Sequence, residues 1–376
     1  MVKLTPPMGW NSWNTFGENI NEQMIFETAD QLVDSGLAGK GYEYLVIDDC
    51  WSLKERGEDD RLVADPQKFP HGIKTVADYV HSKGLKFGMY SCAGNLTCAG
   101  YPGSFEHEFL DAETFASWGV DFLKYDYCYH SPIIHGKYLY RRMGLALQNC
   151  GRDILFSACS WGADQTHEWI KETGASMWRS TGDIFDTWES VKDLARQQEK
   201  LHPYNGVGCF NDMDMLIVGM HGKGNVGLAG CSDTQYKTHF SLWAFLGSPL
   251  MIGCDIRTMD EATLRILSNE EIIRINQDPA CRQPVKLSGF CSDDNGLMYY
   301  RLLSNGDLAL GIFNLGEHTI RPSINLDEMG LPLSTGKTLE LHEVWTNERF
   351  TVTNATLSQT LEPFDCKIFR AKVVDR

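Results

Sequence analysis

The sequence has no hydrophobic run long enough to cross a membrane and no excess of basic residues. No stretch of about 18 or more consecutive apolar residues occurs in the 376-residue chain. Acidic residues outnumber basic ones by 50 to 34, which gives a formal net charge of −16. Proteins that bind nucleic acid or an anionic lipid surface usually carry a basic patch. The sequence therefore predicts no nucleic-acid partner and no membrane segment.

The chain also lacks the cysteine and histidine spacings that are typical of metal sites. Its twelve cysteines form no CxxC pair, and its histidines form no HxH or HExxH motif. One GxGxxG sequence spans Gly222–Gly227, but it comes late in the chain, and no acidic residue follows at the usual offset of about 20 residues. We therefore expect neither a metal ion nor a cofactor.

The N-terminal residues 1–10 lack the apolar segment of a secretory signal peptide. The cysteine content is also too low for a small disulfide-stapled scaffold. These two features predict a cytoplasmic protein, or a secreted one if a leader has been removed. The sequence contains no internal repeat and no low-complexity tract.

Short apolar runs alternate with amphipathic stretches from the start of the chain to about residue 280. The expected strands are 8–10, 44–47, 85–90, 120–125, 154–158, 176–179, 207–211 and 250–253. The helices expected between them include 22–35, 73–83, 112–118, 137–149, 188–200 and 234–246. About eight such units close a (β/α)8 TIM barrel, which we predict for residues 1–280. A doubly wound sheet is the alternative, but it needs fewer strands and usually a phosphate-binding loop.

The pattern changes after residue 280. Short alternating strands are expected at 297–303, 308–314, 339–344, 350–352 and 366–371, with turn signals such as Asn305-Gly306 between them. This pattern is typical of an antiparallel β-sandwich. We predict a C-terminal β-sandwich domain over residues 281–376, joined to the barrel by a short link.

Polar residues, often an aspartate beside a tryptophan or tyrosine, follow nearly every expected barrel strand. They include Asp48–Asp49, Tyr90, Lys124–Asp126, Ser160–Trp161, Arg179–Asp183 and Asp212–Asp214. The active sites of such barrels lie at the carboxyl ends of the strands. One aspartate there is usually a turn or helix cap, but carboxylates at five strand ends, together with tryptophans, favour a neutral polyhydroxylated ligand such as a sugar.

Six sequence segments occur in an order that points to one family. They are Pro7–Trp13, Ile47–Trp51, His81–Tyr90, Thr97–Gly100, Leu123–Asp126 and Ile275–Pro279. Together they resemble glycoside hydrolase family 27, which contains α-galactosidases and α-N-acetylgalactosaminidases. The resemblance runs from residue 5 to about residue 280, and six ordered motifs are far more specific than any single one. It implies an exo-glycosidase that hydrolyses terminal α-linked galactose with retention of configuration.

The resemblance also implies roles for individual residues. Asp126 is implied as the nucleophile and Asp183 as the general acid/base. The implied substrate-binding residues are Trp13, Asp48, Asp49, Tyr90, Cys98, Lys124, Cys159, Ser160, Trp161, Arg179, Asp214 and Met215. Cys98 and Cys128 are implied to form a disulfide beside the site. A small carbohydrate with a terminal α-galactoside is the implied partner, and a homo-oligomer is left open.

The residue types fit retaining chemistry, which needs one ionised and one protonated carboxyl group about 5–5.5 Å apart. Lys124 lies two residues before Asp126, so both point to one face of the strand, where the lysine charge would keep Asp126 anionic. An ordinary ion pair inside the barrel would give the same pattern. Asp183 must sit where its pKa is raised if it is to act as an acid.

Three other functions remain open from the sequence. Lys124 could form a Schiff base in a lyase built on the same barrel, and an inactive sugar-binding protein would keep the same fold. Within the family, Ser160 and Ala163 match the α-N-acetylgalactosaminidase pattern, whereas Trp161-Gly162 matches galactosidases. We favour the galactosidase, because an acetamide group at C2 needs both space and polar partners.

Overall fold

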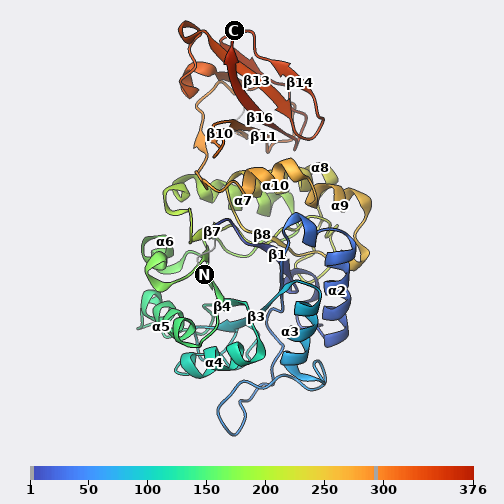
Figure 1. Cartoon of the computed structure of the whole chain (residues 1–376), viewed down its shortest axis with the longest axis vertical. Helices are drawn as coiled ribbons and strands as arrows, with labels where there is room; N and C mark the ends of the chain where they lie inside the picture. The colour runs from blue at the N-terminus through green and yellow to red at the C-terminus, as the bar shows by residue number, and fades with distance from the viewer. Residues whose placement is uncertain (1–3, 292–294) are drawn as a thin grey trace.

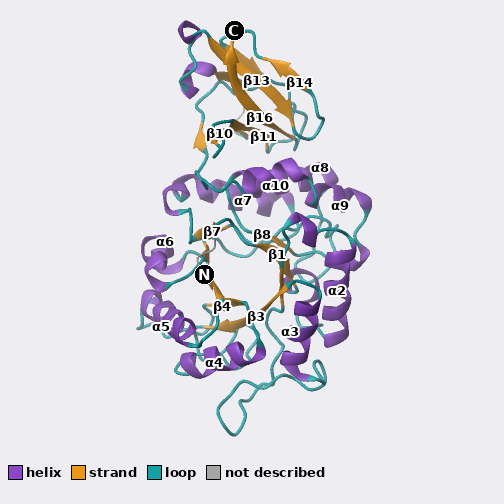
Figure 2. Ribbon diagram, viewed as in Figure 1, coloured by secondary structure: helices purple, strands orange, loops and turns teal. Residues whose placement is uncertain are grey.

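Eight parallel strands curl into a ring in the N-terminal part of the chain, with helices around the outside (Figures 1 and 2). The computed structural model describes residues 4–291 and 295–376. The strands are β1 (Met8–Asn11), β2 (Tyr44–Val46), β3 (Lys86–Cys92), β4 (Phe122–Asp126), β5 (Leu155–Cys159), β6 (Met177–Arg179), β7 (Phe210–Asp212) and β8 (Leu250–Ile252). Neighbours pair in sequence from β1 to β7, and β8 returns to pair with β1.

The ring is closed between β7 and β8 by one residue that follows β7. The N–H of Leu216 donates to the carbonyl of Met251 at 2.7 Å, and the carbonyl of Leu216 accepts from the N–H of Gly253 at 2.9 Å. The predicted (β/α)8 barrel is therefore confirmed, although the strand pairing at this seam is short.

Helices surround the barrel, and several of them begin at a side-chain cap. They are α1 (Trp13–Phe16), α2 (Glu22–Asp34), α3 (Gly72–Ser82), α4 (Glu108–Trp118), α5 (Gly136–Asn149), α6 (Thr166–Trp169), α7 (Trp188–Gln197), α8 (Asp233–Phe245), α9 (Glu261–Leu267) and α10 (Glu270–Asn276). The side chains of Asn21, Thr187 and Ser232 accept N–H groups in the first turns of α2, α7 and α8. Within the described part of the chain, every helix falls short of the length and apolar character that a membrane span requires.

The first turn of α4 lies outside the helix expected at 112–118. Glu108 and Asp111 make this turn polar in sequence, yet both side chains are buried. Arg142 pairs with Glu108 at 2.8 Å, and Arg56 pairs with Asp111 at 2.7 Å. These ion pairs allow carboxylates to occupy buried positions, which a hydrophobicity pattern does not reveal.

Beyond the barrel, antiparallel strands form the predicted β-sandwich. The larger sheet has the order β14 (Arg349–Thr351), β13 (Lys337–Glu343), β16 (Cys366–Asp375), β11 (Leu308–Asn314), β10 (Gly296–Leu302) and β9 (Val285–Lys286). β12 (Ser323–Asn325) and β15 (Thr356–Ser358) form the second layer. Leu310, Ile312 and Leu341 pack against Ile324 and Leu357 between the layers. The three-residue strands β12 and β15 were not predicted.

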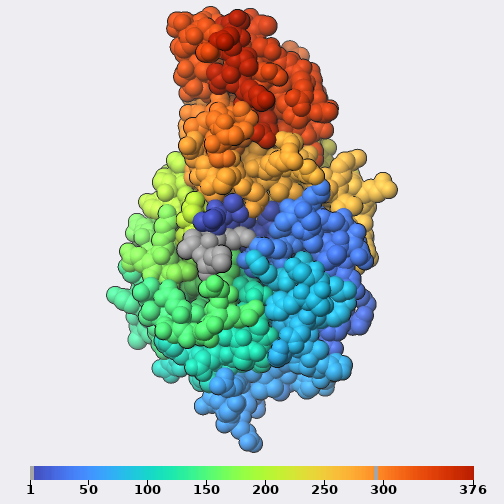
Figure 3. Space-filling model, viewed as in Figure 1, coloured from blue at the N-terminus to red at the C-terminus, as the bar shows by residue number. Residues whose placement is uncertain are grey.

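The opposite face of the large sheet packs on the barrel. The space-filling view shows the C-terminal domain lying directly against the barrel (Figure 3). Phe313 and Ile368 of this sheet belong to the same hydrophobic cluster as the barrel core. The indole N–H of Trp188 donates to the carbonyl of Leu315 at 3.0 Å. The predicted domain division after residue 280 falls in the segment between α10 and β9.

Candidate active site

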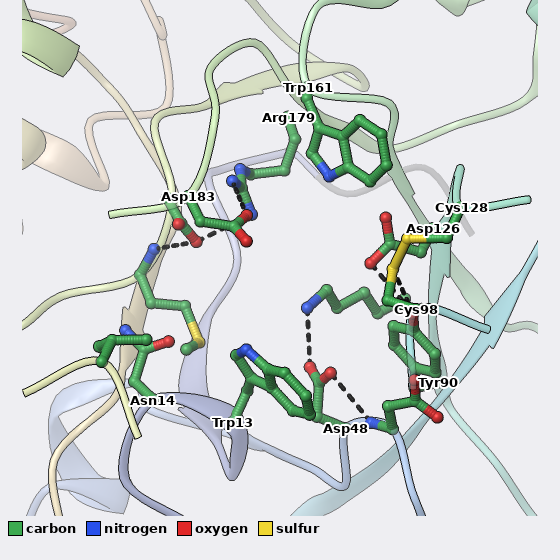
Figure 4. Close-up of a pocket in the computed structure, with 15 residues that line it drawn as sticks. Trp13, Asn14, Asp48, Tyr90, Cys98, Asp126, Cys128, Trp161, Arg179 and Asp183 are labelled. Carbon is green, nitrogen blue, oxygen red and sulfur yellow. Dashed lines mark hydrogen bonds and ion pairs between the residues drawn. A yellow bond between two sulfur atoms is a disulfide. The ribbon is translucent and has the colours of Figure 1, made fainter. Parts of the chain in front are cut away.

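A pocket of about 190 Å³ opens at the carboxyl ends of the barrel strands (Figure 4). It is smaller than the 300–1,000 Å³ or so of clefts that accept drug-sized ligands, so its size suits a single sugar ring. Asp126 and Asp183 lie on opposite sides of the pocket, and the two indoles, Trp161 and Trp13, lie on two other walls.

Twelve of the predicted catalytic and substrate-binding residues line this pocket. They are Trp13, Asp48, Asp49, Tyr90, Cys98, Lys124, Asp126, Trp161, Arg179, Asp183, Asp214 and Met215. Cys128 also lines it, joined to Cys98 in a disulfide that ties the segment after β3 to the segment after β4. Seven barrel strands, β1 to β7, and the segments that follow them therefore deliver these side chains to one place.

The first side of the pocket is built around Asp126, the last residue of β4. One carboxylate oxygen of Asp126 accepts the Tyr90 hydroxyl at 3.1 Å, and the other accepts the N–H of Tyr127 at 2.9 Å. Burial raises the pKa of Asp126 to about 6, although the charge of Lys124 and the Tyr127 N–H act in the opposite direction. Two hydrogen bonds thus fix the orientation of a buried carboxylate.

The partner of Lys124 differs from the one that strand spacing suggested. Its ammonium group forms an ion pair with Asp48 at 2.8 Å, and the amide of Asn11 donates to the same Asp48 oxygen at 2.7 Å. The charge of Lys124 therefore acts on Asp126 through space, without the direct pairing that the sequence suggested. Asp49 accepts N–H groups from Cys50 at 2.7 Å and Ala99 at 3.0 Å, which orients its carboxylate beside Asp48.

The second side is built around Arg179, a buried residue at the end of β6. Its guanidinium pairs with Asp214 at 2.9 Å and with Asp183 at 2.8 Å. The side chain of Asp183 is 58% exposed, whereas those of Arg179 and Asp214 are 4% and 7% exposed. Neighbouring protein atoms raise the pKa of Asp183, but the charge and hydrogen bond of Arg179 outweigh this effect and hold it below its usual value. In this state Asp183 is a base.

Only one residue of the pair Ser160–Trp161 faces the pocket. Trp161 has a left-handed backbone, with φ of 56°, and it precedes Gly162, where a Cβ atom would lie 2.6 Å from the carbonyl oxygen of Ser180. This tight turn directs the indole to the pocket wall. Position 162 requires glycine because no side chain fits against the Ser180 carbonyl.

Two predicted contacts are not brought to the pocket. Ser160 is 1% exposed, and its hydroxyl hydrogen-bonds Thr166 at 2.5 Å. Cys159 is also 1% exposed, and it lines a second, smaller cavity beneath the pocket, with its sulfur 3.7 Å from Arg179. Successive side chains at a strand end point to opposite faces, so Ser160 points away from the barrel interior, whereas Cys159 points inward but lies below the pocket.

Two lining residues, Asn14 and Val226, were missed by sequence reasoning. The N–H of Val226 donates to the carbonyl of Asn14 at 3.0 Å and so joins a loop after β7 to α1. Asn14 directly follows the predicted contact Trp13, so its position in the sequence could have indicated that it lies at the pocket. Val226 lies inside the GxGxxG segment, and nothing in the sequence connects that segment with the pocket.

One group of residues in the described part of the chain has metal-ligand atoms close together. The sulfurs of Cys98 and Cys128 and a carboxylate oxygen of Asp126 lie within 4.8 Å of one another. The two sulfurs are bonded to each other, whereas metal ligation requires free thiolates. This group therefore fits a pocket wall better than a metal centre.

Comparisons with known proteins match the whole chain. A family described as "Alpha galactosidase A" matches residues 5–278, and "Alpha galactosidase C-terminal beta sandwich domain" matches residues 297–371. An α-galactosidase of Cyamopsis tetragonoloba is 42% identical over 366 residues, covering 97% of this chain and 85% of that protein. An α-galactosidase of Coffea arabica is 43% identical over 367 residues, covering 97% and 93%. The structure of the Saccharomyces cerevisiae α-galactosidase with raffinose has a TM-score of 0.89 at 30% identity, covering 99% and 98%.

Proposed function

This chain belongs to the α-galactosidase family, glycoside hydrolase family 27, and we propose how the residues of its pocket release a terminal α-linked galactose. The enzyme is a glycoside hydrolase that acts on terminal α-galactosides with retention of configuration. The observation that carries the assignment of residues is that Asp126 and Asp183 line one pocket of single-sugar size.

Asp126 acts as the nucleophile in the first step. Its ionised carboxylate attacks the anomeric carbon, and a covalent galactosyl-enzyme forms as the bond to the leaving oxygen breaks. The hydrogen bonds from Tyr90 and Tyr127 hold the carboxylate in one orientation. Lys124 and the Asp48–Asp49 pair bind sugar hydroxyls, and the axial 4-hydroxyl of galactose is recognised there.

Asp183 donates a proton to the leaving oxygen and, in the second step, removes one from the attacking water. In the free enzyme Arg179 holds Asp183 as an ionised carboxylate. The second step needs this ionised form. For the first step its exposed side chain must be protonated in the enzyme–substrate complex. Binding of the galactoside between Arg179 and Asp183 would weaken their ion pair and allow this.

The lyase alternative fits the geometry poorly. An amine that forms a Schiff base must lose its proton. Burial lowers the pKa of Lys124, but the charge of Asp48 and further carboxylates outweigh it and raise the pKa above its ordinary value. Lys124 is thus held as a cation that binds hydroxyls.

Trp161 sets the choice at the 2-position of the sugar. It is the only residue among Ser160, Trp161 and Ala163 that lines the pocket in the described structure, so the serine and alanine of the α-N-acetylgalactosaminidase pattern face elsewhere. An indole on this wall leaves little room for an acetamide group. We expect the enzyme to prefer α-galactosides.

The test is the ratio of kcat/KM for p-nitrophenyl α-galactoside and p-nitrophenyl α-N-acetylgalactosaminide. The ratio should favour the galactoside, and Trp161→Ala should reduce it by about tenfold. Ser160→Ala is the matched control and should leave the ratio unchanged, because Ser160 bonds Thr166 away from the pocket. A wild-type ratio in favour of the N-acetylated sugar would overturn the assignment.

Soluble oligosaccharides with a terminal α-galactose, of the raffinose type, are proposed as substrates, since the yeast relative was solved with raffinose. The cytoplasmic location stays a prediction from the sequence. The Cys98–Cys128 disulfide weighs against it, because such bonds are rare in a reducing cytosol.

A further inference from the structure

Arg179 faces a third carboxylate that the roles above do not use. Asp212 ends β7 and is paired in register with Arg179 on the neighbouring strand β6, so both side chains point into the barrel. Asp212 is 7% exposed, and one of its carboxylate oxygens accepts the N–H of Asp214 at 2.9 Å. It lines a smaller cavity together with Arg179 and is not among the residues that line the substrate pocket, where Asp183 lies.

Around Asp212, the carboxylates outnumber the cations that lie near them. Arg179 is the cation beside it on β6, with Asp214 on the segment after β7, and Lys124 on β4 acts at longer range. Arg179 also pairs with Asp183 and Asp214, so its charge acts on Asp212 while its guanidinium is paired with two other carboxylates. A carboxylate in such a group raises the pKa of the others, because each added negative charge makes the next ionisation less favourable.

A small cavity lies beneath the pocket and is lined by several of these charged side chains. Its volume is about 30 Å³, and its polar lining includes Arg179, Asp212, Asp214, Lys124 and Cys159. The buried Nε of Arg179 has no hydrogen-bond partner among the described residues. A cavity of this size holds a water molecule when polar groups surround it. Asp212 and Arg179 thus border a space that adjoins the substrate pocket and shares Lys124, Arg179, Asp214 and Met215 with it.

We propose that Asp212 is a positioning residue whose buried charge offsets that of Arg179 and so allows Asp183 to carry the proton that the leaving group needs. Arg179 alone would hold Asp183 as a carboxylate, which suits only the second step. With Asp212 behind it, the guanidinium exerts a weaker pull on the Asp183 anion. The inference rests on the proposed role of Asp183 as the acid.

The ionisation of Asp212 limits the pH range in which this device works. Burial raises the pKa of Asp212 to about 6, with Arg179 opposing the shift. Above that pH Asp212 is charged and supports protonation of Asp183. Below it Asp212 is neutral, but free protons are then abundant enough to protonate Asp183 directly.

Asp212→Asn tests the proposal because it removes the charge and keeps the shape, and its carbonyl can still accept the N–H of Asp214. The measurement is the pH dependence of kcat with raffinose, a substrate with a poor leaving group, since kcat reports the groups of the enzyme–substrate complex. We expect the alkaline limb to move to lower pH by about 0.5–1 unit. With p-nitrophenyl galactoside the shift should be smaller, because its leaving group needs little protonation.

Asp278→Asn is the matched control. Asp278 is also 7% exposed, but it lies beyond α10, where it accepts the N–H of Ser304 at 3.0 Å. The pH profile of this variant should be that of the wild type, whatever its thermal stability. If Asp212→Asn does not fold, Asp212→Ser, which leaves room for water in the cavity, carries the same expectation.

An unmoved alkaline limb in a folded Asp212 variant would overturn the proposal and leave Asp212 as a structural residue. A limb that moves to higher pH would overturn it as well. Failure of the proposed function is a separate result, because it would show as an Asp183→Ala variant that loses activity equally on good and poor leaving groups.

Discussion

The two cations of the pocket hold their carboxylates in different ways. Lys124, whose side chain is 16% exposed, pairs with the buried Asp48, which also accepts a hydrogen bond from Asn11, so the carboxylate beside the nucleophile is held in place. Arg179 pairs with Asp183, whose side chain is more than half exposed, and one guanidinium N–H has no partner among the described residues. The comparison indicates that the nucleophile needs a fixed position, whereas the acid/base, which gains and loses a proton in each turnover, needs freedom to move.

The largest effect should come from loss of the nucleophile Asp126. Asp126→Ala removes the nucleophile, and we expect kcat to fall by at least about 10⁴-fold, as for other catalytic nucleophiles. Added azide should restore part of the turnover of an activated aryl galactoside and give a galactosyl azide of inverted configuration. Circular dichroism and thermal unfolding serve as controls for folding. Activity near the wild-type level would remove Asp126 from its role.

Loss of the acid/base Asp183 should have an effect that depends on the substrate. Asp183→Ala should lower kcat/KM for raffinose by about 10²–10⁴-fold, since a sugar leaving group requires a proton. With p-nitrophenyl galactoside the first step should stay nearly normal, and the galactosyl-enzyme should accumulate as a burst of nitrophenol. An equal loss on both substrates would mean that Asp183 is structural.

The smallest effect needs no mutation. Asp126 acts as a nucleophile only when ionised, and its pKa is raised to about 6. For p-nitrophenyl galactoside, kcat/KM should therefore fall as pH decreases through this value, by about tenfold between pH 7 and pH 5. A profile that stays flat down to pH 4 would show that Lys124 outweighs burial at this carboxylate.

Local sequence patterns predicted the elements and most of the pocket. Strand periodicity placed β2, β4 and β6 within two residues of their ends, because buried parallel strands are short apolar runs with polar residues after them. The same rule placed Asp126 and Arg179 at the mouth of the barrel. Each of these predictions depends on neighbours in the chain, which a sequence displays directly.

The site features that were predicted wrongly or missed depend on contacts between distant segments or on the direction in which a single side chain points. Lys124 bonds Asp48, which lies 76 residues away, in preference to Asp126 beside it. Val226 lines the pocket from a loop that is bonded to Asn14, a residue near the other end of the barrel sequence. Ser160 points away because it directly follows β5 on the face opposite to Cys159, and its hydroxyl bonds Thr166.

The Cys98–Cys128 disulfide has a practical consequence for anyone who produces the enzyme. It joins two loops that form one wall of the pocket. Protein made in a reducing host starts with both thiols free and acquires the bond only on later exposure to an oxidant. The fraction of active molecules in a preparation would then record its history of handling, and batches with identical purity would differ in specific activity.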